Sequence, residues 1–388
     1  MGNRARNDIN YSYNALIWVN EKRDRKMGFE SIIGQDHVVK QLKRSIVSGE
    51  VNHALLFLGQ ESVGKRMTAI AYAKALNCLD ENSRKEGDFC DNCRSCQLIS
   101  LMQHPDVRLL TPETTGDKTV ISIDAIRAKS GEAPPHPLPL REDVALKPLE
   151  GRTKVYIIDP ANRPGLQEEA GNALLLTLEE PPKNVVIILI SSRPNYVLPT
   201  LVSRCHPIKF NLIRTDKILT KVMEESEDEV EAKIISSIAN GKLGFALDMA
   251  KNPHLLALRK ELTNEIFRLT PVETGAAITL GAITRDIASR VELYERENES
   301  ADRKVRRNLP IVFDMILSIW RDLLVLKEEG SNKHILNIDL TDEMEELARK
   351  YSTEKIYAAM DAVNRTKRYI ERNSNIDLTL ENMWSDIL

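Results

Sequence analysis

The chain has 388 residues, of which 42% are hydrophobic and 29% charged, and its formal net charge is −3. This length predicts two or three domains, and the composition is typical of a globular protein rather than a disordered or fibrous one. The longest apolar run, residues 185–190, is far too short to cross a bilayer, and the N-terminus lacks a convincing signal peptide, so we expect a cytoplasmic protein without membrane contact. A net charge near zero also argues against strong autonomous binding to nucleic acid.

The first 26 residues carry six basic and three acidic side chains and no sustained hydrophobic period. A regular pattern of apolar residues begins directly after Met27. We therefore expect either that the protein starts at Met27 or that residues 1–27 form a disordered extension.

Strand-like and helix-like patterns alternate between residues 28 and 210. Three short apolar runs predict buried strands, and longer stretches carry apolar residues at helical spacing. The predicted strands are 54–58, 155–159 and 185–190, and the predicted helices include 65–76 and 166–178. Apolar strands that alternate with amphipathic helices indicate a parallel sheet covered by helices, so we predict an α/β domain over residues 28–210.

The first predicted strand leads into a glycine-rich loop, residues 59–66, with the sequence GQESVGKR. Such a loop between a strand and a helix cradles phosphates with its backbone N–H groups, and its lysine reaches the outer phosphates. Gly59, Gly64 and Lys65 are therefore candidate nucleotide-binding residues, with an ordinary glycine-rich turn as the alternative. A Ser or Thr that holds magnesium is expected directly after the lysine, but Arg66 stands there, so the predicted cradle lacks its metal ligand.

Asp159 ends the second predicted strand at the carboxyl edge of the sheet, where phosphate chemistry would take place. An ATPase of this type places a second acid beside it to orient the attacking water, but the next residue here is Pro160. Two separate losses therefore predict that this chain does not hydrolyse ATP by itself. Asp159 is kept as a candidate residue of a degenerate nucleotide site, and whether any nucleotide binds is left open.

Four of the five cysteines lie close together in the sequence. Four thiolates with the spacing Cys-x11-Cys-x2-Cys-x2-Cys suit a tetrahedral Zn²⁺ site that leaves no open position for catalysis. In a chain without an export signal, a metal site is favoured over disulfides. Free thiols or an iron–sulfur cluster are the alternatives. We predict a structural zinc module over residues 78–96, with the ligands Cys78, Cys90, Cys93 and Cys96.

No strand pattern follows residue 210. Residues 211–253 carry short helical patterns that predict a small helical domain, and residues 254–388 carry longer ones that predict an all-α C-terminal domain. Just before this region, the tripeptide Ser203-Arg204-Cys205 places an arginine at the rim of the α/β domain, where it could serve the site of a neighbouring subunit. Taken alone, Arg204 is better explained by a surface salt bridge.

Several motifs together, in their order and spacing, resemble the clamp-loader branch of the AAA+ ATPases. They are residues 33–35 (IGQ), the glycine-rich loop, the cysteine group, residues 104–106 (HPD), 154–159 (KVYIID), 172–175 (NALL), 178–182 (LEEPP) and 203–205 (SRC). The resemblance is close over residues 28–210, looser over 211–253, and beyond 254 rests on helical character and length alone. It implies a RecA-like AAA+ domain with a zinc module, then a helical lid domain and a helical collar domain for oligomerisation.

The departures from the family pattern all indicate a member that does not hydrolyse ATP. Besides Arg66 and Pro160, Gly244 stands where a hydrolysing lid would carry an arginine that senses the nucleotide. The resemblance then implies a subunit of DNA polymerase III, a DNA-directed DNA polymerase, in a five-membered ring with gamma/tau and delta subunits. There Arg204 would act as an arginine finger in trans on ATP bound by gamma/tau, while the assembly loads the sliding clamp onto primer-template DNA.

Two other functions stay open on the sequence alone. An ATP-hydrolysing gamma/tau-like subunit would require Thr68 to reach the metal and another acid to replace Pro160. A zinc-dependent DNA-binding regulatory protein would use the cysteine group, but a near-neutral charge and four occupied ligand positions disfavour it. ATP turnover by the isolated chain would support the first alternative, and strong salt-sensitive DNA binding the second.

Overall fold

The computed structural model describes residues 28–115, 118–128, 137–226, 228–268, 275–292, 300–330 and 332–388. The predicted extension over 1–27 lies outside these residues. The chain divides into two compact units, Met1–Ile213 and Arg214–Leu388. Among the described residues, none of the helices combines the length and the apolar character needed to span a membrane.

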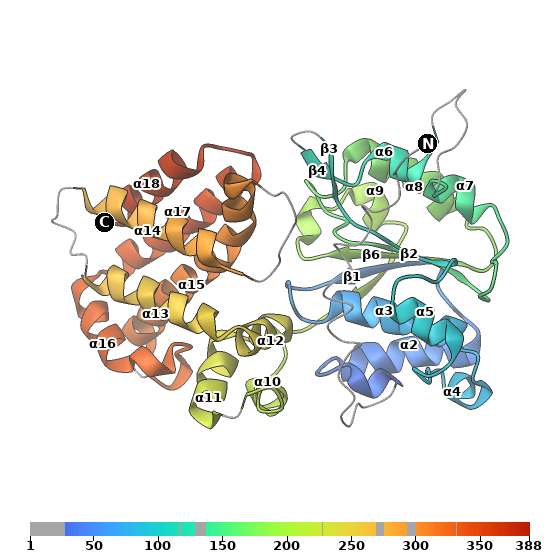
Figure 1. Cartoon of the computed structure of the whole chain (residues 1–388), viewed down its shortest axis with the longest axis horizontal. Coiled ribbons are helices and arrows are strands. Elements are labelled where there is room, and N and C mark those ends of the chain that lie inside the picture. The colour runs from blue at the N-terminus through green and yellow to red at the C-terminus, as the bar shows by residue number, and fades with distance from the viewer. Residues whose placement is uncertain are drawn as a thin grey trace, which may run out of the picture. The chain divides into compact units, whose positions relative to one another are not determined.

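A five-stranded parallel sheet forms the centre of the first unit (Figure 1). Its strands, in spatial order, are β2 (Val107–Leu110), β5 (Lys154–Ile158), β6 (Val185–Ser191), β1 (Ala54–Leu58) and β7 (His206–Lys209). A separate antiparallel pair is formed by β3 (Glu113–Thr115) and β4 (Lys118–Val120). The three predicted strands are therefore confirmed as the centre of the sheet, and β2 and β7 are additional.

Helices cover both faces of this sheet because its central strands are apolar on both sides. Leu55 and Phe57 of β1 pack with α2 (Asp36–Ser48), α3 (Lys65–Asn77) and α5 (Arg94–Ser100). Ala54 and Leu56 face the other core, with α6 (Ile123–Ile126), α7 (Leu140–Val144), α8 (Glu168–Glu179) and α9 (Pro199–Val202). Figure 1 shows these two helical layers. The shorter elements are η1 (Gly28–Ser31), α4 (Glu81–Lys85) and η2 (Pro194–Tyr196).

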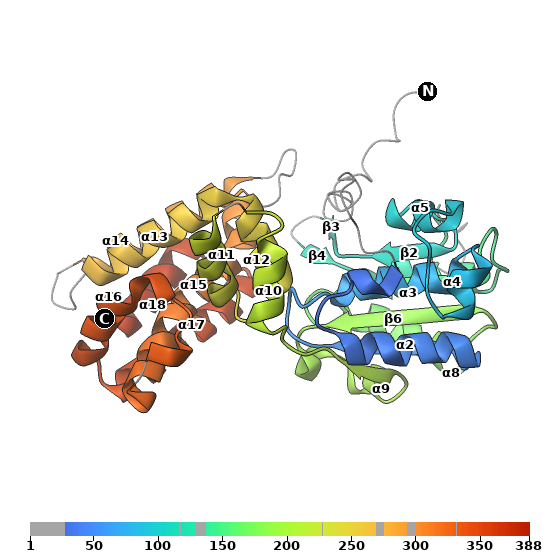
Figure 2. The same ribbon diagram turned by 90° about the horizontal axis from the view of Figure 1, so that it is seen from below.

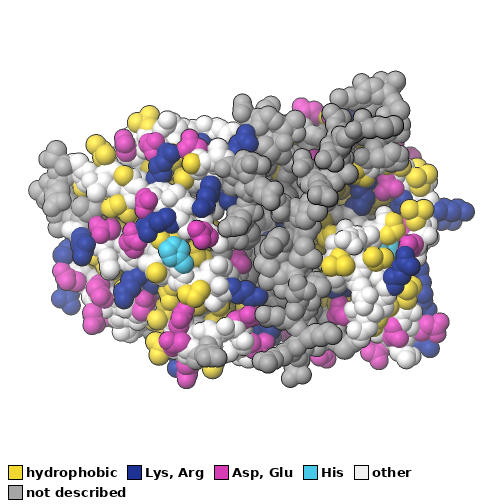
Figure 3. Space-filling model, in the orientation of Figure 1, with side chains coloured by type: hydrophobic (Ala, Val, Ile, Leu, Met, Phe, Trp, Pro, Cys, Tyr) yellow, Lys and Arg dark blue, Asp and Glu magenta, His cyan; other side chains and the backbone are white. Residues whose placement is uncertain are grey.

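The second unit is helical throughout its described residues, so the predicted fold class, an α/β domain followed by helices, is confirmed. Three short helices group together in Figures 1 and 2: α10 (Thr215–Val222), α11 (Glu229–Ile238) and α12 (Leu243–Lys251). They are followed by α13 (Pro253–Arg268), α14 (Ala276–Arg290), α15 (Ala301–Glu329), η3 (Asn332–His334), η4 (Ile338–Leu340), α16 (Thr341–Lys350), α17 (Thr353–Glu371) and α18 (Ile376–Ile387). On the face seen in Figure 3, basic and acidic side chains are mixed over this unit.

The predicted lid and collar regions are joined by polar contacts inside the second unit. Lys242, which precedes α12, donates to Asp314 of α15 at 2.7 Å, and Lys367 of α17 also pairs with Asp314. Burial alone would raise the pKa of Asp314, but these two lysines hold it below its usual value. The structure thus places residues 214–253 in one compact unit with the C-terminal helices, and the division at residue 253 stays a prediction.

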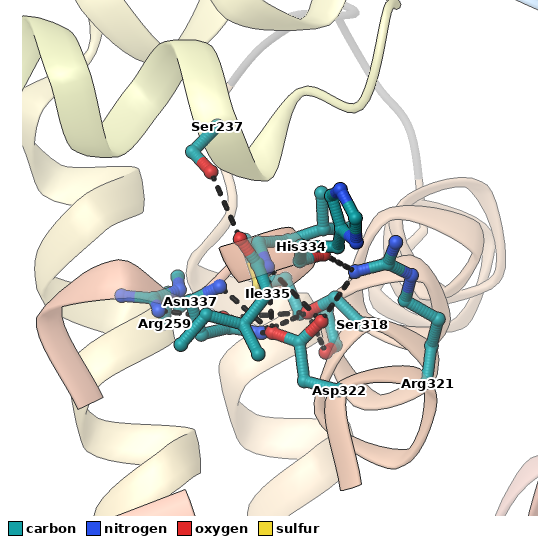
Figure 4. A network of polar contacts seen from close by, with 10 residues as sticks. Ser237, Arg259, Ser318, Arg321, Asp322, His334, Ile335 and Asn337 are labelled. Carbon is teal, nitrogen blue, oxygen red and sulfur yellow. Dashed lines mark hydrogen bonds and ion pairs between the residues drawn. The ribbon is translucent and has the colours of Figure 1, made fainter. Parts of the chain in front are cut away.

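A buried carboxylate organises the segment between α15 and α16 (Figure 4). Asp322 of α15 is 0% exposed and accepts hydrogen bonds from the N–H groups of Leu336 and Asn337 at 2.8–3.0 Å and from Asn337 Nδ2 at 2.7 Å. Arg321 donates to the same carboxylate at 2.7 Å. These bonds satisfy a charge that would otherwise be costly to bury.

Two further helices bind the same segment. Arg259 of α13 is 1% exposed and donates to Asn337 at 2.6 Å and to Asp339 at 2.8 and 2.9 Å. Ser237 of α11 donates to the Ile335 carbonyl at 3.5 Å. Residues 335–339 therefore connect α11, α13 and α15 through hydrogen bonds.

Replacing Asp322 by alanine is expected to destabilise the second unit by about 3 kcal/mol, because it leaves buried N–H donors without an acceptor. Trp320 and Trp384 are buried in this unit, so urea unfolding followed by tryptophan fluorescence measures the effect. The exposed Glu345→Ala is the control and should leave the midpoint unchanged. Equal midpoints for the two variants would mean that the network does not stabilise the unit.

Candidate functional site

The glycine-rich loop joins β1 to α3, as the sequence predicts for a phosphate cradle. Gly64, directly before α3, has a φ of 95°, a backbone conformation that glycine adopts without strain. Lys65 is the first residue of α3, and its Nζ donates to the Gly59 carbonyl at 2.7 Å and also to the Gln60 carbonyl. Burial lowers the pKa of Lys65 to about 8, although the nearby charges of Asp159 and Glu61 oppose this. The lysine is therefore bound to its own loop.

Arg66 and Asp159 form an ion pair beside this loop. The Arg66 Nε donates to the Asp159 carboxylate at 2.6 Å, and the Asp159 side chain is only 16% exposed. Arg66 stands where the sequence pattern expects the magnesium ligand, and Asp159 directly follows β5 at the carboxyl edge of the sheet. The Arg66 guanidinium thus neutralises the Asp159 carboxylate, which would otherwise be available to a metal ion.

The hydroxyl of Thr68 does not replace the missing ligand. Thr68 is fully buried in α3 and donates to the Gly64 carbonyl at 2.9 Å, one turn earlier in the helix. Such a bond holds the hydroxyl against its own helix. In this geometry the Thr68 hydroxyl does not serve as the magnesium ligand that a gamma/tau-like subunit would need here.

Arg204 lies at a different place, after α9, and meets the end of α8. Its Nε donates to Glu179 Oε1 at 2.7 Å, and its Nη2 pairs with the same carboxylate. The Arg204 side chain is 35% exposed. Two apolar residues of the same helices are exposed as well, Leu176 (50%) on α8 and Val202 (40%) on α9. Arginine is one of the residue types that are enriched at protein–protein interfaces.

The four clustered cysteines come together at the C-terminal end of α3 and the start of α5. Their sulfur atoms all lie within 4.8 Å of one another, and none of the four is paired in a disulfide. The N–H groups of Leu79 and Cys93 point at sulfurs of the group, at 3.5 and 3.3 Å. A set of four sulfur ligands at this separation fits a tetrahedral metal, so the group is able to hold a metal ion.

Burial makes two of the four clustered thiols harder to ionise, whereas nearby N–H groups make a third easier to ionise. Burial raises the pKa of Cys78 to about 11 and also raises that of Cys96. Burial opposes the ionisation of Cys93, but N–H groups of Leu79 and Cys96 lower its pKa to about 7. Four thiolates at this distance repel one another unless a cation lies between them.

The loop that carries the cysteines also contacts η1, the first described element, and the helices α2 and α3. Asp88 accepts from the Phe29 N–H at 2.9 Å and pairs with Lys43 of α2 at 2.5 Å. Asp91 pairs with Lys74 of α3 at 2.7 Å. The rings of Phe29 and Phe89 pack edge to face with centroids 5.3 Å apart. The cysteine group is thereby linked to η1, α2 and α3.

The HPD motif (residues 104–106) has a structural role close to the cysteine group. The Asp106 carboxylate accepts hydrogen bonds at 2.7–2.8 Å from three successive backbone N–H groups, those of residues 149–151. Asn77, next to Cys78, accepts from the N–H groups of Arg152 and Thr153 at 2.8 and 3.0 Å. These bonds fix the approach to β5 and hence the position of Asp159.

Comparison with known proteins agrees with the motifs. The family model described as DNA polymerase III, delta subunit, matches residues 34–214, and the model described as DNA polymerase III, delta subunit, C terminal, matches residues 304–387. DNA polymerase III subunit delta' of Bacillus subtilis is 24% identical over 349 residues, which is 90% of this chain and 94% of that protein. The chain belongs to the delta-prime family of DNA polymerase III clamp-loader subunits. The family was therefore correctly predicted from the motifs.

Other subunits of DNA polymerase III are similar to this delta-prime family member over part of their length. Subunit tau of B. subtilis is 29% identical over 92% of this chain, but this chain spans only 60% of that protein. Subunit gamma/tau of Mycobacterium tuberculosis is 32% identical over 54% of this chain and 33% of its own length. Among solved structures, a gamma-subunit-related protein of Thermotoga maritima has a TM-score of 0.42 at 17% identity, covering 89% of this chain and 97% of that one.

Proposed function

We propose that this chain is a clamp-loader subunit of the delta-prime type that does not hydrolyse ATP and instead completes the ATP site of a neighbour with Arg204. The Arg66–Asp159 ion pair carries the proposal. A magnesium ion on Asp159 would have to displace this guanidinium, and Pro160 offers no second acid to orient water. The chain keeps the scaffold of a nucleotide domain but lacks the groups for hydrolysis.

The proposed role of Arg204 follows from its place on the surface. During phosphoryl transfer, negative charge on the γ-phosphate is stabilised by a guanidinium that a neighbouring chain can supply. The exposure of Arg204, together with that of Leu176 on α8 and Val202 on α9, supports such a role at an interface with a gamma/tau subunit. Together with gamma/tau and delta, the subunit would help to load the sliding clamp onto primer-template DNA, and contact with clamp and DNA would occur through the complex.

We further propose that the metal held by Cys78, Cys90, Cys93 and Cys96 is Zn²⁺. Zinc prefers four sulfur ligands in tetrahedral sites that have a structural role. When bound, it would supply the charge that keeps four thiolates together. The side chains around the group link it to η1, α2 and α3, which supports a structural rather than a catalytic role.

The isolated chain is expected to show no ATP turnover with Mg²⁺, and Lys65→Ala should give the same background rate. Steady turnover that Lys65→Ala abolishes would contradict the proposal and support a gamma/tau-like motor. The positive half of the test is reconstitution with gamma/tau and delta. A clamp-loading assay on primed DNA should show activity only when this chain is present, and co-purification of the subunits checks assembly.

A further inference from the structure

The geometry points to Glu179 as a positioning residue that holds the Arg204 guanidinium ready for the neighbouring site. This inference rests on the proposed function and adds a residue to it. Glu179 contacts the Arg204 guanidinium, so in this role it acts through the arginine rather than on ATP.

The backbone of Glu179 is held in place by helix α8. Glu179 is the last residue of α8, and Leu174 and Leu178 of this helix are 0% and 3% exposed in the core. Glu180 caps the helix, and Pro181 and Pro182 after it prevent the helix from continuing. The carboxylate therefore projects from a rigid end, rather than from a loop.

The two edges of the Arg204 guanidinium have unequal partners. Nε and Nη2 meet the Glu179 carboxylate, and a hydrogen bond between charged groups is roughly twice as strong as a neutral one. Nη1 donates to the Thr200 carbonyl at 3.2 Å and to the Ser203 hydroxyl at 3.3 Å, both neutral acceptors. A phosphate can compete with these weak contacts for Nη1 while Glu179 keeps the opposite edge.

Holding the Arg204 side chain in this way lowers the entropic cost of placing it at the neighbouring site. Arginine has many rotamers, and fixing a half-exposed one at the moment of subunit contact costs conformational entropy. The Glu179 carboxylate also brings a negative charge near the phosphate. The resulting repulsion opposes the entropic benefit of holding Arg204. Because Glu179 binds the edge opposite Nη1 and its side chain is 44% exposed, water screens this repulsion. We therefore expect positioning to dominate.

The test is single-turnover ATP hydrolysis by the full complex with gamma/tau, delta and DNA, in which the site next to this chain is followed as a separate phase. Glu179→Ala should slow this phase at saturating ATP by about threefold to tenfold and leave the ATP concentration that half-saturates it unchanged. Glu179→Gln, which keeps the Oε1 acceptor but loses the charge, should restore only part of the rate. Glu180→Ala removes the adjacent exposed acid and should behave as the unaltered protein. Co-elution of the ring checks that each variant assembles.

A double variant separates positioning from a general structural effect. In complexes that carry Arg204→Ala, adding Glu179→Ala should change the rate no further. An unchanged or faster rate for Glu179→Ala, while Arg204→Ala is slow, would overturn the positioning role and leave the proposed function intact. A normal rate for Arg204→Ala itself would instead overturn the proposed function.

Discussion

Removing the metal from the cysteine group is expected to lower the melting temperature of the first unit by about 10 °C or more. Structural zinc contributes folding energy directly, and each kcal/mol lost shifts the melting temperature of a unit of this size by roughly 2–4 °C. The four sulfurs lie within 4.8 Å of one another, and their loop holds η1, α2 and α3 through Asp88 and Asp91. Thermal melts followed by circular dichroism, with and without a chelator, measure the shift.

Two cysteine variants make this test specific. Cys93→Ser should lower the melting temperature and remove the effect of the chelator, because the ligand set is already broken. Cys205 is the control: it is 6% exposed, and burial raises its pKa to about 12, as for an inert core thiol. Cys205→Ser should keep full sensitivity to the chelator. A chelator without effect on the unaltered chain would indicate free thiols, and visible absorbance would indicate an iron–sulfur cluster.

The central strands were predictable because burial on both faces leaves them as continuous apolar runs. Residues 54–58 and 185–190 meet this condition, and the structure places them side by side as β1 and β6. β2 and β7 were not predicted because Arg108 interrupts the first and only Ile208 is buried in the second. Strands at the edges of a sheet carry polar residues and so lack the pattern.

Spacing along the sequence identified the cysteine group and the glycine-rich loop, since both depend on residues that are close in the chain. The Arg66–Asp159 pair could not be found in this way. The two residues are 93 positions apart, and they follow β1 and β5, which are separated in the sheet by β6. Opposite charges at the carboxyl edge of one sheet are a usable signal only once the strand order is known.

The Asp322 network and the Glu179–Arg204 pair were missed for a related reason. A helical pattern assigns charged residues to the solvent face, but Asp322 is completely buried by bonds to residues 336 and 337 of the following segment. Glu179 and Arg204 both belong to motifs of the family pattern, yet their contact depends on where the short α9 places residue 204. Long-range packing, not local preference, sets these contacts.

Arg204→Ala is expected to leave the ring assembled but to slow ATP hydrolysis by the complete complex. An arginine supplied in trans contributes about 10³–10⁵ to the rate at the site that it completes. Under the proposed role, only the site next to this chain depends on Arg204, so the other sites should keep their activity and the steady-state rate should fall by less. Single-turnover hydrolysis is therefore the sharper measurement, because the dependent site should become a separate slow phase.

Matched variants show whether an effect of Arg204→Ala comes from the lost guanidinium or from a general disturbance of the surface. Arg204→Lys keeps the charge but loses the planar fork of donors, so the slow phase should persist with a partial recovery of rate. Arg214→Ala removes an arginine whose side chain is 78% exposed and pairs with Asp216, and it should leave all phases unchanged. A single fast phase in an assembled Arg204→Ala complex would show that the neighbouring site obtains its positive charge from another residue, and the proposed role in trans would then be wrong.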